Sequence, residues 1–237
     1  MKTLVNIGAK IEIIDLALYL PKHKALVIAD SHIGFEESLN KQGILIPRFQ
    51  FKEIILRLEK IFEKIKPDTI IINGDIKHEF GTISEQEWRH TLRLIDFLAK
   101  HCKKLILVKG NHDTILGPIA QKRNIDVVAN VVLDDMLITH GDRLMKIPSS
   151  IKTIIIGHEH PAISFRQRPS EKYKCFLVGK YKGKILIVQP SFNLVTEGTD
   201  VSKEYLLSPF LKQNLKNFEC FIVADTVYRF GKLKNLK

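Results

Sequence analysis

The chain has 237 residues, of which 45% are hydrophobic, and its formal net charge is +11. A chain of this length can bury one sizeable core, so we expect a single domain over residues 1–237. No apolar run approaches the ~20 residues of a membrane-spanning helix, which argues against a membrane protein.

The three cysteines argue against a structural role for thiolates. Cys102, Cys175 and Cys220 are far apart and form no CxxC pair, so neither a disulfide framework nor a thiolate zinc site is expected. A reducing compartment fits this pattern. The first residues also lack the apolar stretch of a signal peptide. We therefore expect a cytoplasmic location.

The excess of lysine and arginine bears on the choice of partner. A basic chain favours polyanions, and nucleic acid (DNA or RNA) is the first candidate. The lysines are spread along the chain rather than clustered, however. Lysine-rich chains also arise through demands of solubility or heat tolerance. The charge therefore leaves nucleic-acid binding as an open hypothesis.

The predicted strands are short runs of β-branched and apolar residues. Near the N-terminus, the runs 11–14 and 18–20 are expected to pair with the run 25–29 across the turn 21–24. Several of the later runs are almost entirely apolar, as in strands covered on both faces. These later runs are 69–72, 105–108, 136–139, 153–156, 176–178, 185–188 and 221–223.

Two amphipathic helices are predicted between the early strands. Ile54, Leu58, Ile61 and Ile65 follow the 3.6-residue period and indicate a helix over 48–66. A second helix is predicted over 84–100, where Ser84 and Glu87 form a capping-box pattern. Strands and helices alternate in the first half, and strands dominate the second. The pattern predicts an α/β fold, a layered α/β/β/α sandwich of two mixed sheets flanked by helices.

Short polar motifs follow five of the predicted strands. Open α/β sheets place ligand sites beyond the carboxyl ends of their strands, so these motifs are expected to share one site. The motifs are Asp30-Ser31-His32, Gly74-Asp75, Gly110-Asn111-His112-Asp113, Thr139-His140-Gly141, Gly157-His158 and His160.

The residue types in these motifs point to metal chemistry. Aspartate, histidine and asparagine without cysteine form a mixed oxygen and nitrogen donor set, which suits Mn²⁺, Fe²⁺, Zn²⁺ or Co²⁺ in catalytic sites. The number of donors suffices for two ions that share a carboxylate. Such a pair clamps a phosphate and activates a water molecule.

The ordered pattern D-x-H, G-D, G-N-H-D, H-G and G-H-x-H, from Asp30 to His160, resembles the calcineurin-like metallophosphoesterase superfamily. The sequence around these motifs resembles the ICC-like phosphoesterases of archaea and bacteria. The composition, rich in lysine and isoleucine, fits an archaeal source. Some bacterial members are associated with DNA ligases or Lhr-type helicases, so DNA-repair partners are implied by the resemblance alone. The segments that carry the closer resemblance are 32–37, 74–80, 190–193, 198–201 and 208–211.

The resemblance also implies a role for each motif residue. Two divalent ions are implied, Mn²⁺ first, with Fe²⁺, Zn²⁺, Co²⁺ and Ni²⁺ as alternatives. His112 is implied to contact the phosphate and protonate the leaving oxygen, Asp113 to orient His112 by accepting its other N–H, and His78 to face the same pocket. The implied metal ligands are Asp30, His32 and His160 for the first ion, Asp75 as the bridge, and Asn111, His140 and His158 for the second ion.

These roles favour a metal-dependent phosphodiesterase or nuclease, in which a metal-activated hydroxide attacks phosphorus. Two alternatives stay open: a hydrolase of a small phosphodiester or cyclic nucleotide, and a non-catalytic scaffold of the same fold. The retention of every implied metal ligand disfavours the scaffold. Protein phosphatase activity is disfavoured because Ser/Thr phosphatases of the superfamily carry G-D-x-x-D-R-G, whereas this chain reads Gly74-Asp75-Ile76-Lys77-His78.

Overall fold

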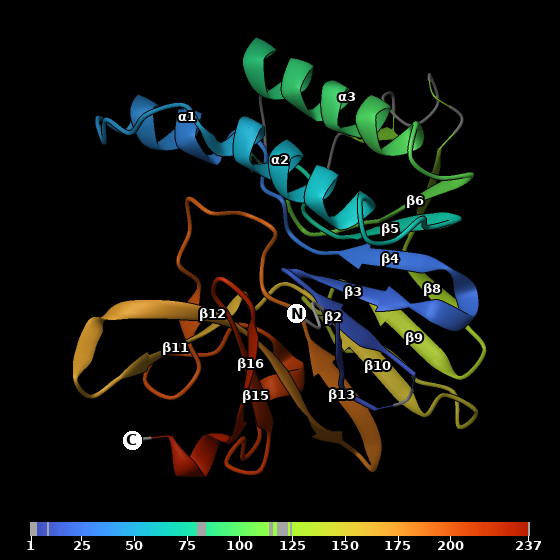
Figure 1. Cartoon of the computed structure of the whole chain (residues 1–237), viewed down its shortest axis with the longest axis vertical. Helices are drawn as coiled ribbons and strands as arrows, with labels where there is room; N and C mark the ends of the chain where they lie inside the picture. The colour runs from blue at the N-terminus through green and yellow to red at the C-terminus, as the bar shows by residue number, and fades with distance from the viewer. Residues whose placement is uncertain are drawn as a thin grey trace.

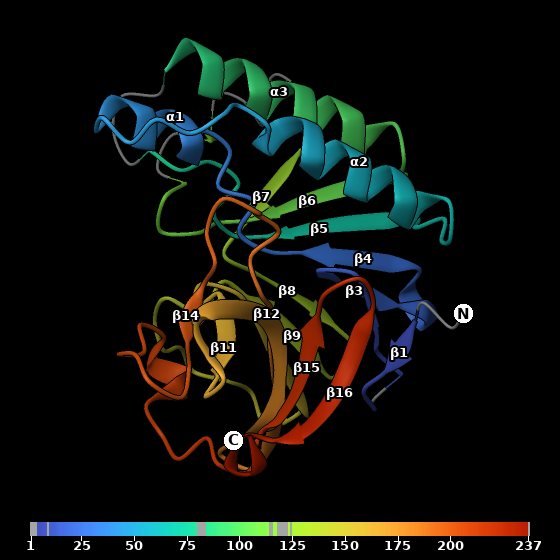
Figure 2. The ribbon, with the colours of Figure 1, turned by 60° about the vertical axis from the view of Figure 1, so that its left-hand side comes forward.

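The structure is a computed structural model that describes residues 4–8, 10–79, 84–113, 116–117, 123 and 125–236. Two sheets pack face to face, and helices cover the outer face of one of them (Figures 1 and 2). The α/β class and the two mixed sheets predicted from the sequence are confirmed.

The first sheet contains seven strands in the order β1 to β7. Neighbours from β1 to β4 are antiparallel, whereas β4, β5, β6 and β7 run parallel. The parallel strands place their carboxyl ends at one edge. The bounds are β1 Val5–Asn6, β2 Glu12–Ile14, β3 Ala17–Leu20, β4 Ala25–Ile28, β5 Thr69–Asn73, β6 Lys104–Val108 and β7 Asp126–Val128.

The second sheet is mixed and contains nine strands, in the order β14-β11-β12-β13-β10-β9-β8, with β15 and β16 added through β12. Its strands β9, β10 and β13 run parallel. The bounds are β8 Asn130–Leu133, β9 Met136–Thr139, β10 Thr153–Ile156, β11 Pro161–Phe165, β12 Arg168–Tyr181, β13 Lys184–Val188, β14 Thr199–Asp200, β15 Glu219–Val223 and β16 Val227–Lys232.

The helices α2 (Gln50–Phe62) and α3 (Glu85–Ala99) lie over the outer face of the first sheet, and α1 (Phe35–Lys41) lies to one side of it (Figure 1). The helices predicted over 48–66 and 84–100 correspond to α2 and α3. The apolar stripe of α2 is buried against the sheet, as its 3.6-residue period requires. In the described part of the chain, no helix has the length and apolar character needed to cross a membrane.

Every predicted strand overlaps an observed one, but one predicted pairing is wrong. β4 pairs with β3 across the short 3₁₀ helix Pro21–His23, whereas β2 pairs with β3 and not with β4. Ile14 lies opposite Ala17 in this hairpin, and Asp15 has a φ of 53° in the turn between them. A tight turn of this kind joins adjacent antiparallel strands, so the first two runs pair with each other.

The two sheets meet through an apolar interior of aliphatic and aromatic side chains. Leu18, Val27 and Ile71 from the first sheet are buried in one cluster with Phe176 and Phe221 from the second. This packing fixes the two sheets against each other, and therefore also fixes the strand ends that carry the polar motifs.

The outer face of the second sheet has a different cover. Phe210, Leu211 and Phe218 are buried against it. They belong to the fully described connection between β14 and β15, whose one regular element is the 3₁₀ helix Pro209–Leu211. The helices α2 and α3 both lie on the first sheet. The segment has no apolar 3.6-residue period and contains Pro209, which explains why it covers the sheet as irregular chain.

Candidate metal centre

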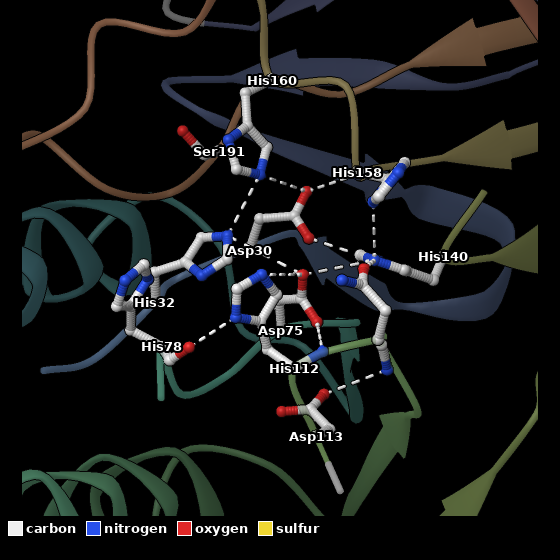
Figure 3. Close-up of polar contacts among 12 residues, drawn as sticks. Asp30, His32, Asp75, His78, His112, Asp113, His140, His158, His160 and Ser191 are labelled. Atoms are coloured by element: carbon white, nitrogen blue, oxygen red, sulfur yellow. Dashed lines mark hydrogen bonds and ion pairs between the residues drawn. The ribbon is translucent and has the colours of Figure 1, made fainter. Parts of the chain in front are cut away.

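The predicted site residues come together beyond the carboxyl ends of five strands (Figure 3). Asp30 follows β4, Asp75 follows β5 and Asn111 follows β6, all in the first sheet. His140 and His158 follow β9 and β10 in the second sheet. Both sheets therefore contribute to one cluster at their shared edge, as the position of the motifs predicts.

One group of donor atoms consists of Asp30, His32 and His160. The Nε2 atoms of His32 and His160 are 3.2 Å apart, and Nε2 of His160 lies 3.5 Å from Oδ2 of Asp30. Donor atoms about 2.1 Å from one tetrahedral ion lie about 3.4 Å from each other. The three side chains thus have the spacing of ligands around a single ion.

A second group consists of Asp75, His140 and His158, with Asn111 beside it. Nε2 of His140 lies 3.3 Å from Oδ2 of Asp75 and 3.2 Å from Nδ1 of His158. The same nitrogen is 2.9 Å from Oδ1 of Asn111. Asp75, His158 and Asn111 therefore each place a donor atom within 3.3 Å of the same nitrogen of His140.

The Asp75 carboxylate faces both groups. Its Oδ2 atom lies 3.3 Å from Nε2 of His140 and 3.8 Å from Nε2 of His32. A carboxylate in this position can bridge two cations. Its other oxygen, Oδ1, accepts the backbone N–H of His112 at 2.8 Å, which fixes the direction of the carboxylate.

The backbone at these residues is strained. Ten described non-glycine residues have positive φ, and half of them belong to the cluster. Each such conformation costs on the order of 1–3 kcal/mol and persists only where the surroundings enforce it, commonly at functional sites. The five cluster residues are Asp30 (53°), His32 (43°), Asp75 (40°), His158 (66°) and His160 (50°).

Two glycines allow the close approach of the loops. A Cβ atom on Gly74 would lie 2.0 Å from Nδ1 of His140, and Gly74 has a φ of 85°. A Cβ atom on Gly110 would lie 2.0 Å from Oδ1 of Asp75 and 2.4 Å from its backbone nitrogen. The G-D and G-N-H-D motifs therefore need glycine for steric reasons.

Three of the four histidines in the two donor groups are held in the neutral form. Burial, aided by nearby histidines, lowers the pKa of His32 to about 3 and that of His158 to about 4. Burial also lowers the pKa of His160 well below its ordinary value. A neutral imidazole has a free lone pair, so these side chains can bind a cation at neutral pH without first losing a proton.

The carboxylates and His140 form a coupled set. Burial raises the pKa of Asp30 to about 6, although the neighbouring His140 opposes this shift. Burial also acts on Asp75, but the contact with His140 and the surrounding histidines lower its pKa to about 2. Burial lowers the pKa of His140, yet contacts with the two aspartates outweigh burial and raise it well above the ordinary value. A proton on His140 and a cation would therefore compete for the same carboxylates.

The cluster fits divalent metal ions. Oδ1 of Asp30 and Nδ1 of His140 face each other as a buried ion pair at 3.3 Å, but within the described residues neither atom makes a hydrogen bond. A buried carboxylate oxygen without a hydrogen bond is costly unless a nearby positive charge compensates it. The mixed oxygen and nitrogen donor set suits Mn²⁺, Fe²⁺, Co²⁺ or Zn²⁺.

His112 and His78 lie beside the two groups. Nδ1 of His112 donates to the backbone carbonyl of His78, and Nε2 of His112 lies 3.9 Å from Oδ2 of Asp75. The ring of His78 packs against Phe35 at 4.4 Å between centroids and against His32 at 5.5 Å. Burial, together with the charge of His112, lowers the pKa of His78 to about 4. The cluster thus contains both predicted histidines.

The orientation expected for Asp113 is not the one observed. The described acceptor for Nδ1 of His112 is the His78 carbonyl, whereas Oδ2 of Asp113 accepts the backbone N–H of Gly110 at 3.1 Å. Asp113 lies three positions after Gly110, so the carboxylate closes its own turn. Burial and the charge of Asp75 raise the pKa of Asp113 to about 7.

Sequence reasoning missed several supporting residues. The buried Lys77 donates to the backbone carbonyls of Glu79 and, at 2.6 Å, of His112. Gln50, at the start of α2, donates to the carbonyls of Ser31 and His32 at 3.1 and 2.7 Å. A lysine and a glutamine are common surface residues, so only the position of Lys77 two residues after Asp75 could have suggested its role.

Ser191 and Lys174 form a further supporting pair. Ser191 is buried and lies beside the ring of His160 (Figure 3). Its Oγ atom accepts a hydrogen bond from Nζ of Lys174 at 2.6 Å. Burial lowers the pKa of Lys174 to about 7. Ser191 belongs to the segment 190–193, which carries part of the family resemblance, whereas no sequence pattern indicated Lys174.

Fold and cluster together define a metal-dependent hydrolase of phosphate esters. The chain belongs to the calcineurin-like phosphoesterase family, which it matches over residues 23–176. That segment contains all the motif residues, and the family implies divalent metal ions at them. No curated protein matches the chain.

Solved structures resemble the chain at low sequence identity. The nuclease MPE from Pseudomonas putida is 20% identical, with a TM-score of 0.68, and the match covers 93% of this chain and 94% of that one. The phosphoesterase YfcE from E. coli is 13% identical, with a TM-score of 0.45 and coverage of 88% and 97%. The first likeness supports the fold assigned above.

Proposed function

We propose that the protein is a phosphodiesterase that acts as a nuclease and uses two divalent metal ions. Mn²⁺ is the first candidate for both ions. Asp30, His32 and His160 would hold one ion, and Asn111, His140 and His158 the other. The observation that carries this proposal is the position of Asp75 Oδ2, which faces one donor group at 3.3 Å and the other at 3.8 Å. A single carboxylate between two groups is the arrangement expected of a two-metal site.

When bound, the ions supply Lewis acidity that activates water and offsets charge developing on the phosphate. The chain's own contribution centres on His112. Its Nδ1 donates to the His78 carbonyl, so the ring is held with Nε2 toward the cluster. In the cationic form, Nε2 can donate a proton to the phosphate or to the leaving oxygen. Lys77 holds the carbonyl of His112 and thereby its loop.

The substrate class rests on charge and on the structural likeness. The net charge of +11 favours a polyanion, and the chain shares its fold with a nuclease over nearly its whole length. Asp113 would act by shaping the 110–113 turn, and His78 by positioning His112 through its carbonyl. A cytoplasmic location stays a prediction from the sequence.

The test is a cleavage assay with Mn²⁺ on end-labelled single- and double-stranded DNA and RNA, with the Asp75→Ala variant as control. We expect cleavage by the wild type and none by the variant, and the product ladder would distinguish endo- from exonucleolytic attack. Cleavage that persists in Asp75→Ala would contradict the assigned site.

Two other results would redirect the proposal. Turnover of bis(p-nitrophenyl) phosphate without cleavage of any nucleic acid would point to a small phosphodiester as the substrate. A folded, metal-loaded protein that hydrolyses neither substrate would support the scaffold hypothesis and overturn the catalytic one.

A further inference from the structure

A segment far along the chain is fastened to the loops of the metal centre. The backbone N–H of Ser208 donates to Oε2 of Glu159 at 2.7 Å, and its hydroxyl donates to the carbonyl of Gly141 at 2.8 Å. Glu159 lies between the proposed ligands His158 and His160, and Gly141 follows the ligand His140. Because Ser208 and Glu159 are buried, this junction fixes the residues before Ser208 beside the centre.

The residues next to this junction expose large apolar side chains. Tyr205 is 76% exposed and Leu207 is 56% exposed, and Leu144, three residues after Gly141, is 54% exposed. Met145 is also exposed. Single exposed apolar residues are common, but several on two joined segments beside a candidate active site indicate a contact surface. We call Arg143–Lys146 together with Lys203–Leu207 and Lys212 the Tyr205 surface.

The charge of this surface is positive. Nζ of Lys212 lies 5.7 Å from the centroid of the Tyr205 ring. Arg143 and Lys146 are exposed, and in the described part of the chain no acidic group lies within 4 Å of either, or of Lys212. The acidic Glu204 is paired with Lys172 at 2.5 Å.

We propose that the Tyr205 surface binds a single strand of nucleic acid and leads it to the metal centre, an inference that rests on the function proposed above. An exposed tyrosine ring offers a face on which an unpaired base can stack, and neighbouring cations bind the phosphates. A base inside a duplex has both faces covered, so the contact selects single strands. The lysine beside the ring and the excess of cations favour this polyanion over a protein partner.

The test compares Tyr205→Ala with Tyr205→Phe and with Tyr228→Ala, which removes a 42% exposed tyrosine on the distant strand β16. Affinity is measured by fluorescence anisotropy with a labelled single strand of about 15 nucleotides and with its duplex. The Asp75→Ala background prevents cleavage. We expect Tyr205→Ala to weaken single-strand binding about tenfold, as loss of one base stack does. Tyr205→Phe and Tyr228→Ala should bind as the parent does, and the duplex affinity should not change.

Failure of this inference can be distinguished from failure of the proposed function. Single-strand binding that is equal in Tyr205→Ala and Tyr228→Ala would overturn the inference. Wild-type turnover of bis(p-nitrophenyl) phosphate tests the function separately, because that reaction requires the metal centre and no strand of nucleic acid.

Discussion

The Asp30 carboxylate accepts the backbone N–H of His158 at 2.8 Å, although the two residues are 128 positions apart. Asp30 follows β4 in the first sheet and His158 follows β10 in the second. The hydrogen bond therefore joins the two sheets at the edge where both proposed metal groups lie. The site depends on how the sandwich closes, and substitutions that alter the closure should act on metal binding and activity together.

The role of His112 gives the first prediction. The His112→Asn variant should lose about 10²–10⁴-fold in kcat, because the side chain that donates a proton from Nε2 is gone. Metal content should stay at the wild-type value, because the proposed function assigns His112 to neither ion, although its donor atom lies within 4.8 Å of those of His32 and His78. Steady-state kinetics and elemental analysis check the two parts. Unchanged turnover in His112→Asn would remove His112 from the mechanism.

A second prediction concerns Glu87 on α3, which supports the loop that orients His112. Oε1 of Glu87 accepts the backbone N–H groups of His78 and Glu79, both at 2.9 Å. Glu87→Ala should lower the free energy of unfolding by about 2 kcal/mol, because buried donors lose a charged acceptor. It should also lower kcat through the displaced His78 carbonyl. Urea unfolding and kinetics measure both effects.

The control for Glu87 is Glu85→Ala, in the first turn of the same helix, where the side chain is 89% exposed. This variant should be close to wild type in stability and in kcat. Equal effects of the two substitutions would show that the loop does not depend on Glu87.

A third prediction tests the steric need for glycine. Gly110→Ala should abolish metal binding and activity, because the new Cβ would lie 2.0 Å from Oδ1 of Asp75. Gly117→Ala is the matched control, since among the described residues no heavy atom other than those of its chain neighbours lies within 4 Å of its added Cβ. Calorimetric titration with Mn²⁺ measures both variants. Normal metal affinity in Gly110→Ala would mean that Asp75 is not a ligand in the position described.

The partly buried Lys174 predicts a dependence of stability on pH. Its pKa falls from 10.5 to about 7 on folding, through burial. Between pH 7 and about 10 the unfolded chain therefore holds a proton that the folded chain lacks, so stability rises with pH in this window. Wild type should gain stability relative to Lys174→Met as pH rises from 7 to 10. Lys180→Met, exposed on the same strand, should show no such trend in thermal melts, and a parallel response of the two variants would contradict the prediction.

Strong periodicity in the sequence predicted the main elements of the fold. The apolar stripes of α2 and α3 and the apolar runs of β5, β9 and β10 were readable because burial on regular elements imposes a period. The short helix α1 was not predicted. It depends on tertiary contacts, since the buried Glu36 accepts the backbone N–H groups of Phe49 and Gln50 at 2.9 and 3.0 Å.

The capping box at α3 shows how a local pattern can be half right. Oγ of Ser84 accepts the N–H of Glu87 at 3.0 Å, as the pattern predicts. The pattern also predicts that the Glu87 carboxylate accepts the backbone N–H of Ser84. Instead, this carboxylate accepts the backbone N–H groups of His78 and Glu79. The edge strands β8 and β16 were missed for a related reason. The side chains of β16 are largely exposed, and β8 buries only Val131 of its four residues, so burial imposes no strong apolar pattern on them.

The site residues were recognisable because their spacing along the chain marks the ends of strands. The contacts that orient them were not, because Lys77, Glu87 and Gln50 act on backbone groups of distant residues. The predicted hydrogen bond from His112 to Asp113 was wrong for the same reason, because the backbone carbonyl of His78 is the acceptor for Nδ1 of His112. Side-chain bonds to backbone groups leave no motif in the sequence.

Calorimetric titration of metal-free protein with Mn²⁺, with turnover of bis(p-nitrophenyl) phosphate followed in parallel, tests the central claim most directly. The account predicts two ions bound per chain, and turnover that rises as the second site fills. It also predicts that Asp75→Ala loses both the second ion and turnover. One ion per chain with full activity, or two ions retained in an active Asp75→Ala variant, would contradict the two-metal centre.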